Sequence, residues 1–408
     1  MKLSEELQWR GFVNQTTYKD IKELDKGNIT FYWGVDPSGP GMTIGHLCIA
    51  VMIRHFINAG HHPILLAGGA TGRIGDPDGK AQERDLKSEA VIQKNVEIIK
   101  GQYEKIFDKD KLVMVNNYDW FKNIGYLEFL RDIGKHVPMS QMLGREFVQS
   151  RLGESGTGIS YAEFSYSLIQ GYDFLHLYRD FGATLQVCGA DQWGNCIAGV
   201  DLIRRVEGSE AHIWSAPLII NKSTGVKFGK TEAGAIWLDP KLTSPFDFYQ
   251  FWFNSDDESV KDYLKLYTLI SKAEYDDLIK DFDSNKSSRI AQRRLAYDVT
   301  KMVHGKDVAD KVVDGTKILF GKTHYSELEE KDKNIIKDIL LIIEDEGELL
   351  EIVVKAGMAS SNTEALTYVK DGAIKVDSVK IDDPKKSFNN GYSLLQKGKN
   401  QFALVVKK

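Results

Sequence analysis

The sequence predicts an α/β fold in which a mostly parallel sheet, covered by helices on both faces, is followed by an α-helical region and a small C-terminal helix and strand module. Three observations lead to this prediction. Short β-branched and aromatic runs alternate with helical segments up to about residue 220. Glycine then becomes less frequent, and helical periodicity dominates from about residue 244 to residue 321. A short helix and strand pattern returns after residue 347.

The stretch from Thr30 to Leu47 is predicted to be a strand, a glycine-rich turn and a helix start. Residues 30–35 are β-branched and aromatic, residues 37–41 suit neither a strand nor a helix, and apolar residues then recur at helical spacing. Unpaired N–H groups at a helix start favour phosphate. Gly45 would let such a ligand approach the backbone, and His46 adds a side-chain donor.

Two other interpretations of this turn remain open. Residues 39–45 are one residue off the dinucleotide-binding fingerprint, which also needs an acidic residue at the end of the second strand. That acid is missing, because residues 63–67 run into Gly68 and Gly69. The second alternative is a purely structural turn. We favour a phosphate site over both.

Composition excludes several classes of protein. The chain has 408 residues, of which 42% are hydrophobic and 27% charged, as in an ordinary soluble protein of two or three domains. No run is apolar enough to cross a membrane, and no secretory or transit signal is evident. Three cysteines without a Cys-x-x-Cys pair argue against disulfides and a cysteine-built zinc site, and favour a reducing compartment such as the cytoplasm. The net charge of −5 means that any nucleic-acid surface must be local.

The following segments continue the alternation. Residues 3–14 are expected to form a short amphipathic helix, residues 87–107 a longer helix and residues 112–115 a strand. The glycine-rich loop from Gly68 to Lys80 is expected to be functional. It is not a Walker loop, because its spacing is wrong and it lacks the Ser or Thr that would hold magnesium.

Residues 126–151 are expected to be helical and to expose Met139, Met142 and Leu143. Such a methionine-rich surface is either part of a core or a subunit contact. We favour the subunit contact.

The next helix carries a polar stripe, because Tyr166, Gln170 and Asp173 are spaced by four and three residues. Solvent is one partner for this stripe. Its apolar and aromatic surroundings favour a bound ligand instead.

Residues 185–189 form a predicted strand that delivers Asp191 to its carboxyl end, where ligands bind in open α/β sheets. A further strand is expected at residues 217–220. The loop after it contains Lys227 and Lys230. These lysines are either solvated or close over a triphosphate.

The sequence of the last part of the chain predicts helices and a basic surface. Ser271 and Glu274 form a capping box within the helical region, and residues 322–333 have the composition of a linker. Residues 385–408 contain six lysines and no acid. With no apolar anchor beside them, these lysines favour RNA or DNA over a membrane.

Six motifs occur in order along the chain. They are Thr43-Ile-Gly-His46, Gly69-Ala-Thr-Gly, Gly75-Asp76-Pro, the stripe of Tyr166, Gln170 and Asp173, Gly189-Ala-Asp-Gln-Trp-Gly-Asn195, and Lys227-Phe-Gly-Lys230-Thr231. Jointly they resemble bacterial tyrosyl-tRNA synthetases, a class I family with a Rossmann-like catalytic domain. The resemblance implies a catalytic domain at 1–240 with a mobile lysine loop near 221–234, an α-helical anticodon-binding domain at 241–321, a linker at 322–346, and an S4-like RNA-binding domain at 347–408.

The resemblance also implies an activity. Members of the family activate L-tyrosine with ATP and Mg²⁺, release pyrophosphate and pass the tyrosyl group to the 3′ end of tRNA(Tyr), normally as homodimers. Since the attacking group is the carboxylate of the substrate, positioning and charge stabilisation are expected to supply most of the catalysis.

The implied site residues fall into three groups. Those expected at the triphosphate or pyrophosphate are Thr43, His46, Lys80, Arg84, Lys227, Lys230 and Thr231. Those expected at tyrosine are Tyr32 and Asp173 for the phenol, Asp76, Tyr166 and Gln170 for the ammonium, and Gln192 for the carboxylate. Those expected at the nucleotide are Asp36, Ser38, Gly45, His46, Gly189, Asp191 and Lys230.

Three departures from the family pattern stand out. Thr43 replaces the histidine that usually begins the first motif, and Trp33 is bulkier than usual and is expected to crowd or stack against the nucleotide. The segment from Ser361 to Thr367 lacks an arginine, so RNA affinity is expected to rest on the lysine-rich tail.

Two rival functions are an RNA-binding relative that has lost the chemistry, and the sister enzyme for tryptophan. The retained motif residues disfavour the first rival. Asp173 together with Tyr32 favours a phenol over an indole.

Overall fold

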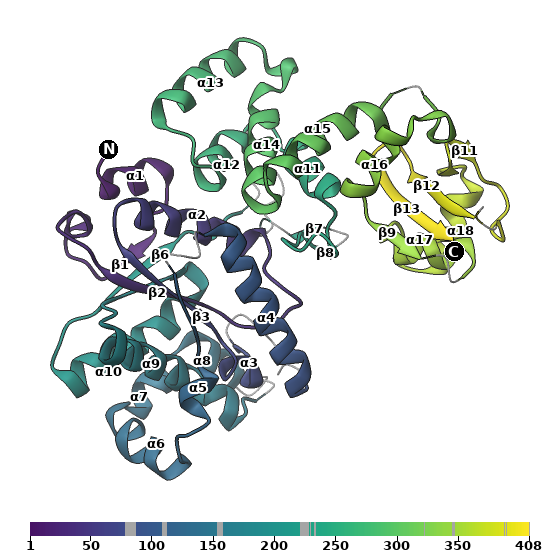
Figure 1. The fold of residues 1–408 in the computed structure, drawn as a ribbon. Helices are drawn as coiled ribbons and strands as arrows, with labels where there is room; N and C mark the ends of the chain where they lie inside the picture. Colours follow the sequence, from purple (N-terminus) through teal and green to yellow (C-terminus); the bar gives the residue numbers. More distant parts are fainter. Residues whose placement is uncertain are drawn as a thin grey trace. The chain divides into compact units, whose positions relative to one another are not determined.

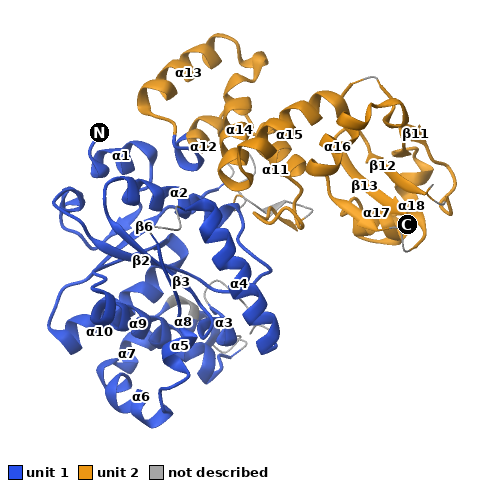
Figure 2. Ribbon diagram, viewed as in Figure 1, with its two compact units in different colours: residues 1–221, 265–269 blue, residues 222–264, 270–408 orange. Residues whose placement is uncertain are grey.

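The structure is a computed structural model. It describes residues 1–77, 87–107, 112–152, 158–220, 228, 230–231, 234–321, 323–344, 347–386, 388 and 390–407. Figure 2 shows its two compact units, Met1–Asn221 with Lys265–Leu269, and Lys222–Leu264 with Ile270–Lys408. None of the described helices is long and apolar enough to span a bilayer.

The first unit is built on a six-stranded sheet with the order β1-β6-β5-β2-β3-β4 (Figure 1). All neighbouring strands are parallel except β1, which pairs antiparallel with β6 at the edge. The chain adds β3 and β4 on one side of β2 and then β5 and β6 on the other, so a topological switch point lies between β2 and β5. The strands are β1 Gln15–Thr16, β2 Thr30–Val35, β3 His62–Ala67, β4 Val113–Asn116, β5 Leu185–Gly189 and β6 His212–Ala216.

Alternate side chains of β2 pack against helices on opposite faces of this sheet. Phe31 contacts Phe56 of α2, with ring centroids 5.3 Å apart. Tyr32 points the other way and lies 5.1 Å from Phe174 of α9. Accordingly α2 and α4 cover one face, and α9 and α10 cover the other (Figure 1). These helices are α2 Ile44–Asn58, α4 Glu89–Ile106, α9 Tyr161–Phe181 and α10 Trp193–Glu207.

The start of α9 is fixed by a cap and by a buried ion pair. Ser160 Oγ accepts the Glu163 N–H at 3.2 Å, as expected for an N-cap residue. The Glu163 carboxylate in turn accepts two hydrogen bonds from the Arg151 guanidinium, at 2.8 and 2.9 Å, and both side chains are buried. Arg151 belongs to α8, so the ion pair ties α8 to the helix that carries the polar stripe.

Two expectations for this unit are corrected. The strand expected at 217–220 lies earlier in the chain, as β6. This strand ends at Ala216, because Pro217 has no N–H for a ladder hydrogen bond. The helix expected at 126–151 is broken around Gly134 and Pro138, and Met142 is buried with 8% exposure. The remaining elements are α1 Leu3–Arg10, η1 Ile21–Asp25, α3 Thr71–Ile74, α5 Tyr118–Phe121, α6 Tyr126–Asp132, η3 Gly134–His136, α7 Met139–Leu143, α8 Glu146–Leu152 and η4 Ala190–Gln192.

The middle of the chain is helical, as predicted. The capping box of Ser271 and Glu274 begins α13, with Ser271 Oγ accepting the Glu274 N–H at 3.3 Å. A short antiparallel ladder of β7 and β8 precedes the helices. The elements are β7 Lys230–Thr231, β8 Gly234–Ala235, α11 Pro245–Phe253, α12 Val260–Tyr267, α13 Lys272–Ser284, η5 Lys286–Ser288, α14 Ile290–His304 and α15 Lys306–Leu319.

The C-terminal part is a five-stranded sheet with the order β11-β10-β12-β13-β9, packed against α17 and α18 around one apolar core. The linker expected at 322–346 is folded where the structure describes it, because η6, α16 and β9 lie there and β9 pairs with β13. Ile336 and Ile339 of α16 are fully buried, while none of its charged residues is buried. The division into four domains stays a prediction. The elements are η6 Tyr325–Glu327, α16 Glu330–Ile339, β9 Ile342–Glu344, α17 Leu349–Lys355, α18 Asn362–Lys370, β10 Ile374–Val376, β11 Val379–Lys380, β12 Gly391–Lys397 and β13 Gln401–Lys407.

Candidate active site

The polar residues of the motifs gather at the carboxyl ends of β2 and β5. Asp36 directly follows β2, and Asp191 lies in η4 directly after β5. The polar stripe of α9 flanks the same end of the sheet, since Tyr166 Oη donates to Asp36 Oδ2 at 2.7 Å. This is the switch point at which open α/β sheets bind ligands.

Tyr32 and Asp173 lie close together between β2 and α9. Tyr32 is 1% exposed, and its hydroxyl has no hydrogen-bond partner among the described residues. Burial raises the pKa of Tyr32 well above its ordinary value, and the nearby Cys196 and Asp173 add to the rise. A buried hydroxyl without a partner is costly, so a polar group of a ligand would be stabilised here.

Asp173 is held by two donors that the sequence analysis missed. Its Oδ2 accepts from Asn117 Nδ2 at 3.1 Å, and its Oδ1 accepts from Trp120 Nε1 at 3.0 Å. Burial raises the pKa of Asp173 to about 8, although both hydrogen bonds oppose the rise. Asn117 comes just after β4, at the same end of the sheet, and that position was the available signal.

Two further carboxylates stand near Tyr166. The Asp36 carboxylate accepts from Tyr166 Oη and, at 2.5 Å, from Thr71 Oγ1. Burial raises the pKa of Tyr166, and the charges of Asp36, Asp76 and Asp173 raise it further. Three acidic side chains around one buried ring make this region attractive to a cation.

Asp76 is fixed by side chains of the Gly189–Asn195 motif. Gln192 Nε2 donates to Asp76 Oδ2 at 2.6 Å, and Asn195 Nδ2 donates to Asp76 Oδ1 at 3.3 Å. The glycine-rich loop that carries Asp76 is thereby connected to the start of α10. Two motifs that the sequence analysis selected separately, those of Asp76 and of residues 189–195, are thus joined by hydrogen bonds.

The start of α2 presents the first motif. The Thr43 N–H donates to His46 Nδ1 at 3.0 Å, so Nδ1 is the acceptor and a neutral ring carries its proton on Nε2. Gly45 is exposed, and a Cβ there would meet only Thr43 Oγ1, at 3.6 Å. The protein itself therefore leaves room for a side chain at this position. A requirement for glycine would have to come from a ligand.

The residues expected near a nucleotide occupy both strand ends. The Ser38 carbonyl accepts a hydrogen bond from Lys87 Nζ, a cation that the sequence analysis missed. A Cβ on Gly189 would lie 2.7 Å from Asp191 Oδ1, so glycine makes room for that carboxylate. The expectation for Trp33 is wrong. This side chain is 2% exposed and packs against Tyr103 of α4 at 5.4 Å, within the core.

Several predicted residues lie outside the described part of the structure. They are Lys80, Arg84, Lys227 and the side chains of Lys230 and Thr231. The backbone of Lys230 and Thr231 forms β7 in the second unit. Their expected contacts with phosphate stay predictions.

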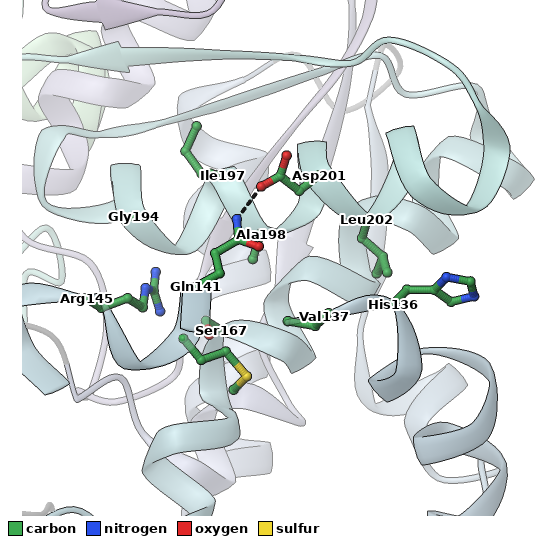
Figure 3. A pocket seen from close by; sticks show the side chains of 11 residues that line it. His136, Val137, Gln141, Arg145, Ser167, Gly194, Ile197, Ala198, Asp201 and Leu202 are labelled. Atoms are coloured by element: carbon green, nitrogen blue, oxygen red, sulfur yellow. Dashed lines mark hydrogen bonds between the residues drawn. The ribbon is translucent and has the colours of Figure 1, made fainter. Parts of the chain in front are cut away.

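A hollow of about 200 Å³ lies beside α10 (Figure 3). Asp201 accepts a hydrogen bond from Gln141 at its rim, and Val137 and Leu202 supply apolar walls (Figure 3). Helical spacing places Gly194, Ala198 and Asp201 on this side of α10. The hollow is thus separate from the group around Asp173.

Comparisons with known proteins identify the family. Residues 24–321 match the model described as tRNA synthetases class I (W and Y), and residues 327–405 match the model of the tyrosine–tRNA ligase SYY-like C-terminal domain. A tyrosine–tRNA ligase of Latilactobacillus sakei is 41% identical over 414 residues, which is 98% of each chain. The chain belongs to the tyrosine–tRNA ligases.

Other tyrosine–tRNA ligases match over the full chain as well. The protein of that name from Listeria monocytogenes serotype 4a is 41% identical over 419 residues and 99% of both chains. Among solved structures, a C-terminally truncated mitochondrial tyrosyl-tRNA synthetase of Aspergillus nidulans has a TM-score of 0.70 at 30% identity, covering 78% of this chain and 94% of that one. A tryptophanyl-tRNA synthetase of Encephalitozoon cuniculi has a TM-score of 0.55 at 14% identity, covering 83% and 93%. That likeness concerns the fold alone.

Proposed function

We propose that this chain activates L-tyrosine with ATP, releases pyrophosphate, and transfers the tyrosyl group to the 3′ end of tRNA(Tyr) in the cytoplasm. Tyr32 and Asp173 carry this proposal. A para-hydroxyl entering between them would hydrogen-bond to the Asp173 carboxyl group and give the buried Tyr32 hydroxyl a partner. Phenylalanine would leave the Tyr32 hydroxyl without a partner and add no hydrogen bond to Asp173, and an indole carries no hydroxyl at that position.

The amino acid's charged end is assigned to the other polar group. Asp76, Tyr166 and Gln170 would hold the ammonium, because the acidic side chains there attract a cation. Gln192, one of whose amide hydrogens binds Asp76, would hold the carboxylate through its remaining hydrogen. This arrangement would direct the carboxylate of the substrate tyrosine toward the carboxyl ends of β2 and β5.

The nucleotide is assigned to the ends of β2 and β5. Asp36 and Ser38 would border it, Gly189 and Asp191 would hold the ribose, and the triphosphate would lie at the α2 start against Thr43, Gly45 and His46. Thr43 is shorter than the usual histidine and uncharged, so it contributes only a hydrogen bond. Lys80, Arg84, Lys227, Lys230 and Thr231 would add charge around the leaving pyrophosphate.

The reaction needs no nucleophilic side chain. The tyrosine carboxylate attacks the α-phosphorus, the bond to the bridging oxygen breaks, and pyrophosphate leaves with the electron pair. The terminal ribose hydroxyl of tRNA then attacks the carbonyl carbon of tyrosyl-adenylate, and AMP leaves. His46, with its proton on Nε2, would donate to phosphate as charge develops.

Mg²⁺ would accompany ATP and shield the charge of its phosphates. The described residues contain no group of three or more His, Cys, Asp or Glu side chains that could hold a metal ion. We expect phosphate oxygens and water to supply most of the ligands of this ion.

Two surfaces complete the proposal. The lysines of residues 385–407 would bind tRNA, with Lys386 and Lys399 exposed. The helices from α6 to α9 would form a homodimer contact, because they expose large apolar side chains. These are Tyr126, Leu127, Met139, Leu143, Leu152 and Tyr161. Mass measurement in solution tests the dimer, and Leu127→Glu should favour the monomer.

Exchange of labelled pyrophosphate into ATP tests the activity. It should depend on L-tyrosine, and neither phenylalanine nor tryptophan should support it at the same concentration. No exchange with any amino acid would instead support an RNA-binding protein without the chemistry. Exchange with tryptophan alone would support a tryptophan-specific synthetase.

A further inference from the structure

Two buried cysteines pack together near the proposed ammonium site, where Cys196 contacts Gln170. Cys188 is in β5 and Cys196 in the first turn of α10, and they are 4% and 0% exposed. They pack in one buried cluster with Ile213, and their thiols are hydrogen-bonded to each other. Burial raises the pKa of Cys196, and the hydrogen bond with Cys188 raises it further, so Cys196 stays a neutral thiol.

Gln170 reaches this pair from α9. Its Nε2 donates to Cys196 Sγ over 3.8 Å, and its Oε1 is buried without a partner among the described residues. A primary amide has a donor end and an acceptor end, so the group that binds one end decides where the other points. The lone pairs of the Cys196 sulfur accept this hydrogen bond.

We propose that Cys196, held in place by Cys188, is a positioning residue that orients the Gln170 amide with its oxygen available to the substrate ammonium. The inference rests on the proposed function. With the amide reversed, its NH₂ group would face the ammonium and repel it, and a buried acceptor for the cation would be lost. An aliphatic residue at position 196 could not fix the amide in this way.

The test replaces Cys196 in the full chain and follows pyrophosphate exchange. Cys196→Val removes the acceptor at similar volume, and Cys196→Ser keeps an acceptor. We expect Cys196→Val to raise KM for tyrosine about threefold to tenfold, as for the loss of one weak hydrogen bond, with KM for ATP unchanged. Cys196→Ser should restore at least part of the affinity. If Cys196→Val does not fold, Cys196→Ala removes the acceptor without added bulk.

An analogue separates amide orientation from packing. The inhibitor 3-(4-hydroxyphenyl)propanoate has the phenol and the carboxylate of tyrosine but no ammonium. Its inhibition constant should be the same for Cys196→Val and the unsubstituted chain. Cys48→Val is the matched control, because Cys48 is also buried but lies in α2. It should leave both tyrosine and analogue affinity unchanged.

Two results would overturn the inference. One is an unchanged KM for tyrosine in Cys196→Val, and the other is an equal loss of affinity for tyrosine and for the analogue. Failure of the proposed function would look different, since the unsubstituted chain would then show no tyrosine-dependent exchange.

Discussion

Asn117 Nδ2 donates to Asp173 Oδ2 at 3.1 Å and so ties the residue after β4 to the middle of α9. The same amide nitrogen donates to Thr71 Oγ1 at 3.1 Å, and Asn117 Oδ1 accepts the Ala70 N–H at 2.6 Å. One fully buried side chain therefore connects the glycine-rich loop with the proposed phenol site. The position of Asp173 depends on this connection and on Trp120.

Trp120→Phe keeps an aromatic ring but removes the Nε1 donor to Asp173. Since that hydrogen bond lowers the pKa of Asp173, its loss should raise the pKa further and weaken tyrosine binding about threefold to tenfold. KM for tyrosine and for ATP, measured by pyrophosphate exchange, checks this. Trp214→Phe is the control, because it loses a buried indole hydrogen bond to the Phe12 carbonyl elsewhere in the unit. An equal rise in KM for tyrosine in Trp214→Phe would contradict the role of Trp120 in holding Asp173.

Tyr32→Phe should lower the affinity for tyrosine without lowering stability. The buried hydroxyl has no partner among the described residues, so its removal should not lower the thermal midpoint. KM for tyrosine should nevertheless rise about fivefold. Tyr103→Phe loses a hydrogen bond to the Leu66 carbonyl at 3.2 Å and should show the reverse, a lower midpoint with KM unchanged. Melting curves and exchange kinetics of the two variants check this contrast. A thermal midpoint that falls equally in both would contradict the assignment of the Tyr32 hydroxyl to the substrate.

Asp173→Asn should change the pH dependence of stability. The folded pKa of about 8 lies above the ordinary 3.8, so the folded chain holds a proton that the unfolded chain has already lost at intermediate pH. Stability contributed by this group is fully present below the ordinary value and is lost as pH rises toward the folded value. The Asn variant cannot ionise. We therefore expect the thermal midpoint of the unsubstituted chain to fall relative to the variant between pH 5 and about pH 8. A constant difference would contradict the raised pKa.

Arg151→Met should strongly destabilise the first unit. It leaves the Glu163 carboxylate buried without its bidentate partner, which costs about 3–5 kcal/mol. Combining it with Glu163→Gln should recover part of the loss, because no uncompensated charge remains. Arg179→Met breaks the exposed pair with Glu207 and should cost about 1 kcal/mol or less. Denaturant titrations of the four variants, with Glu163→Gln alone included, check this ordering. Equal costs for Arg151→Met and Arg179→Met would refute it.

The elements that sequence analysis placed correctly have local signals. The strands at residues 30–35 and 185–189 are β-branched, aromatic or apolar runs next to glycine, and both lie as predicted. The stripe of Tyr166, Gln170 and Asp173 follows from helical spacing alone. All three side chains belong to α9 and face the group at the strand ends.

The contacts that were missed join distant parts of the chain. Asn117 and Trp120 are 56 and 53 residues from Asp173, and no sequence period relates them. The folded segment at 325–344 was missed for another reason. The charged residues of α16 cover its exposed face and hide the spacing of its buried isoleucines, so its composition suggests a linker.

Asp173→Ala tests the central claim most directly. Kinetics of pyrophosphate exchange should show KM for tyrosine raised about tenfold or more, because a buried hydrogen bond to the Asp173 carboxyl group is lost, while KM for ATP stays within about twofold. Asp180→Ala, on the exposed side of the same helix, should change neither constant. A similar rise in both constants for Asp173→Ala, or none in either, would contradict the assignment of Asp173 to the phenol of tyrosine.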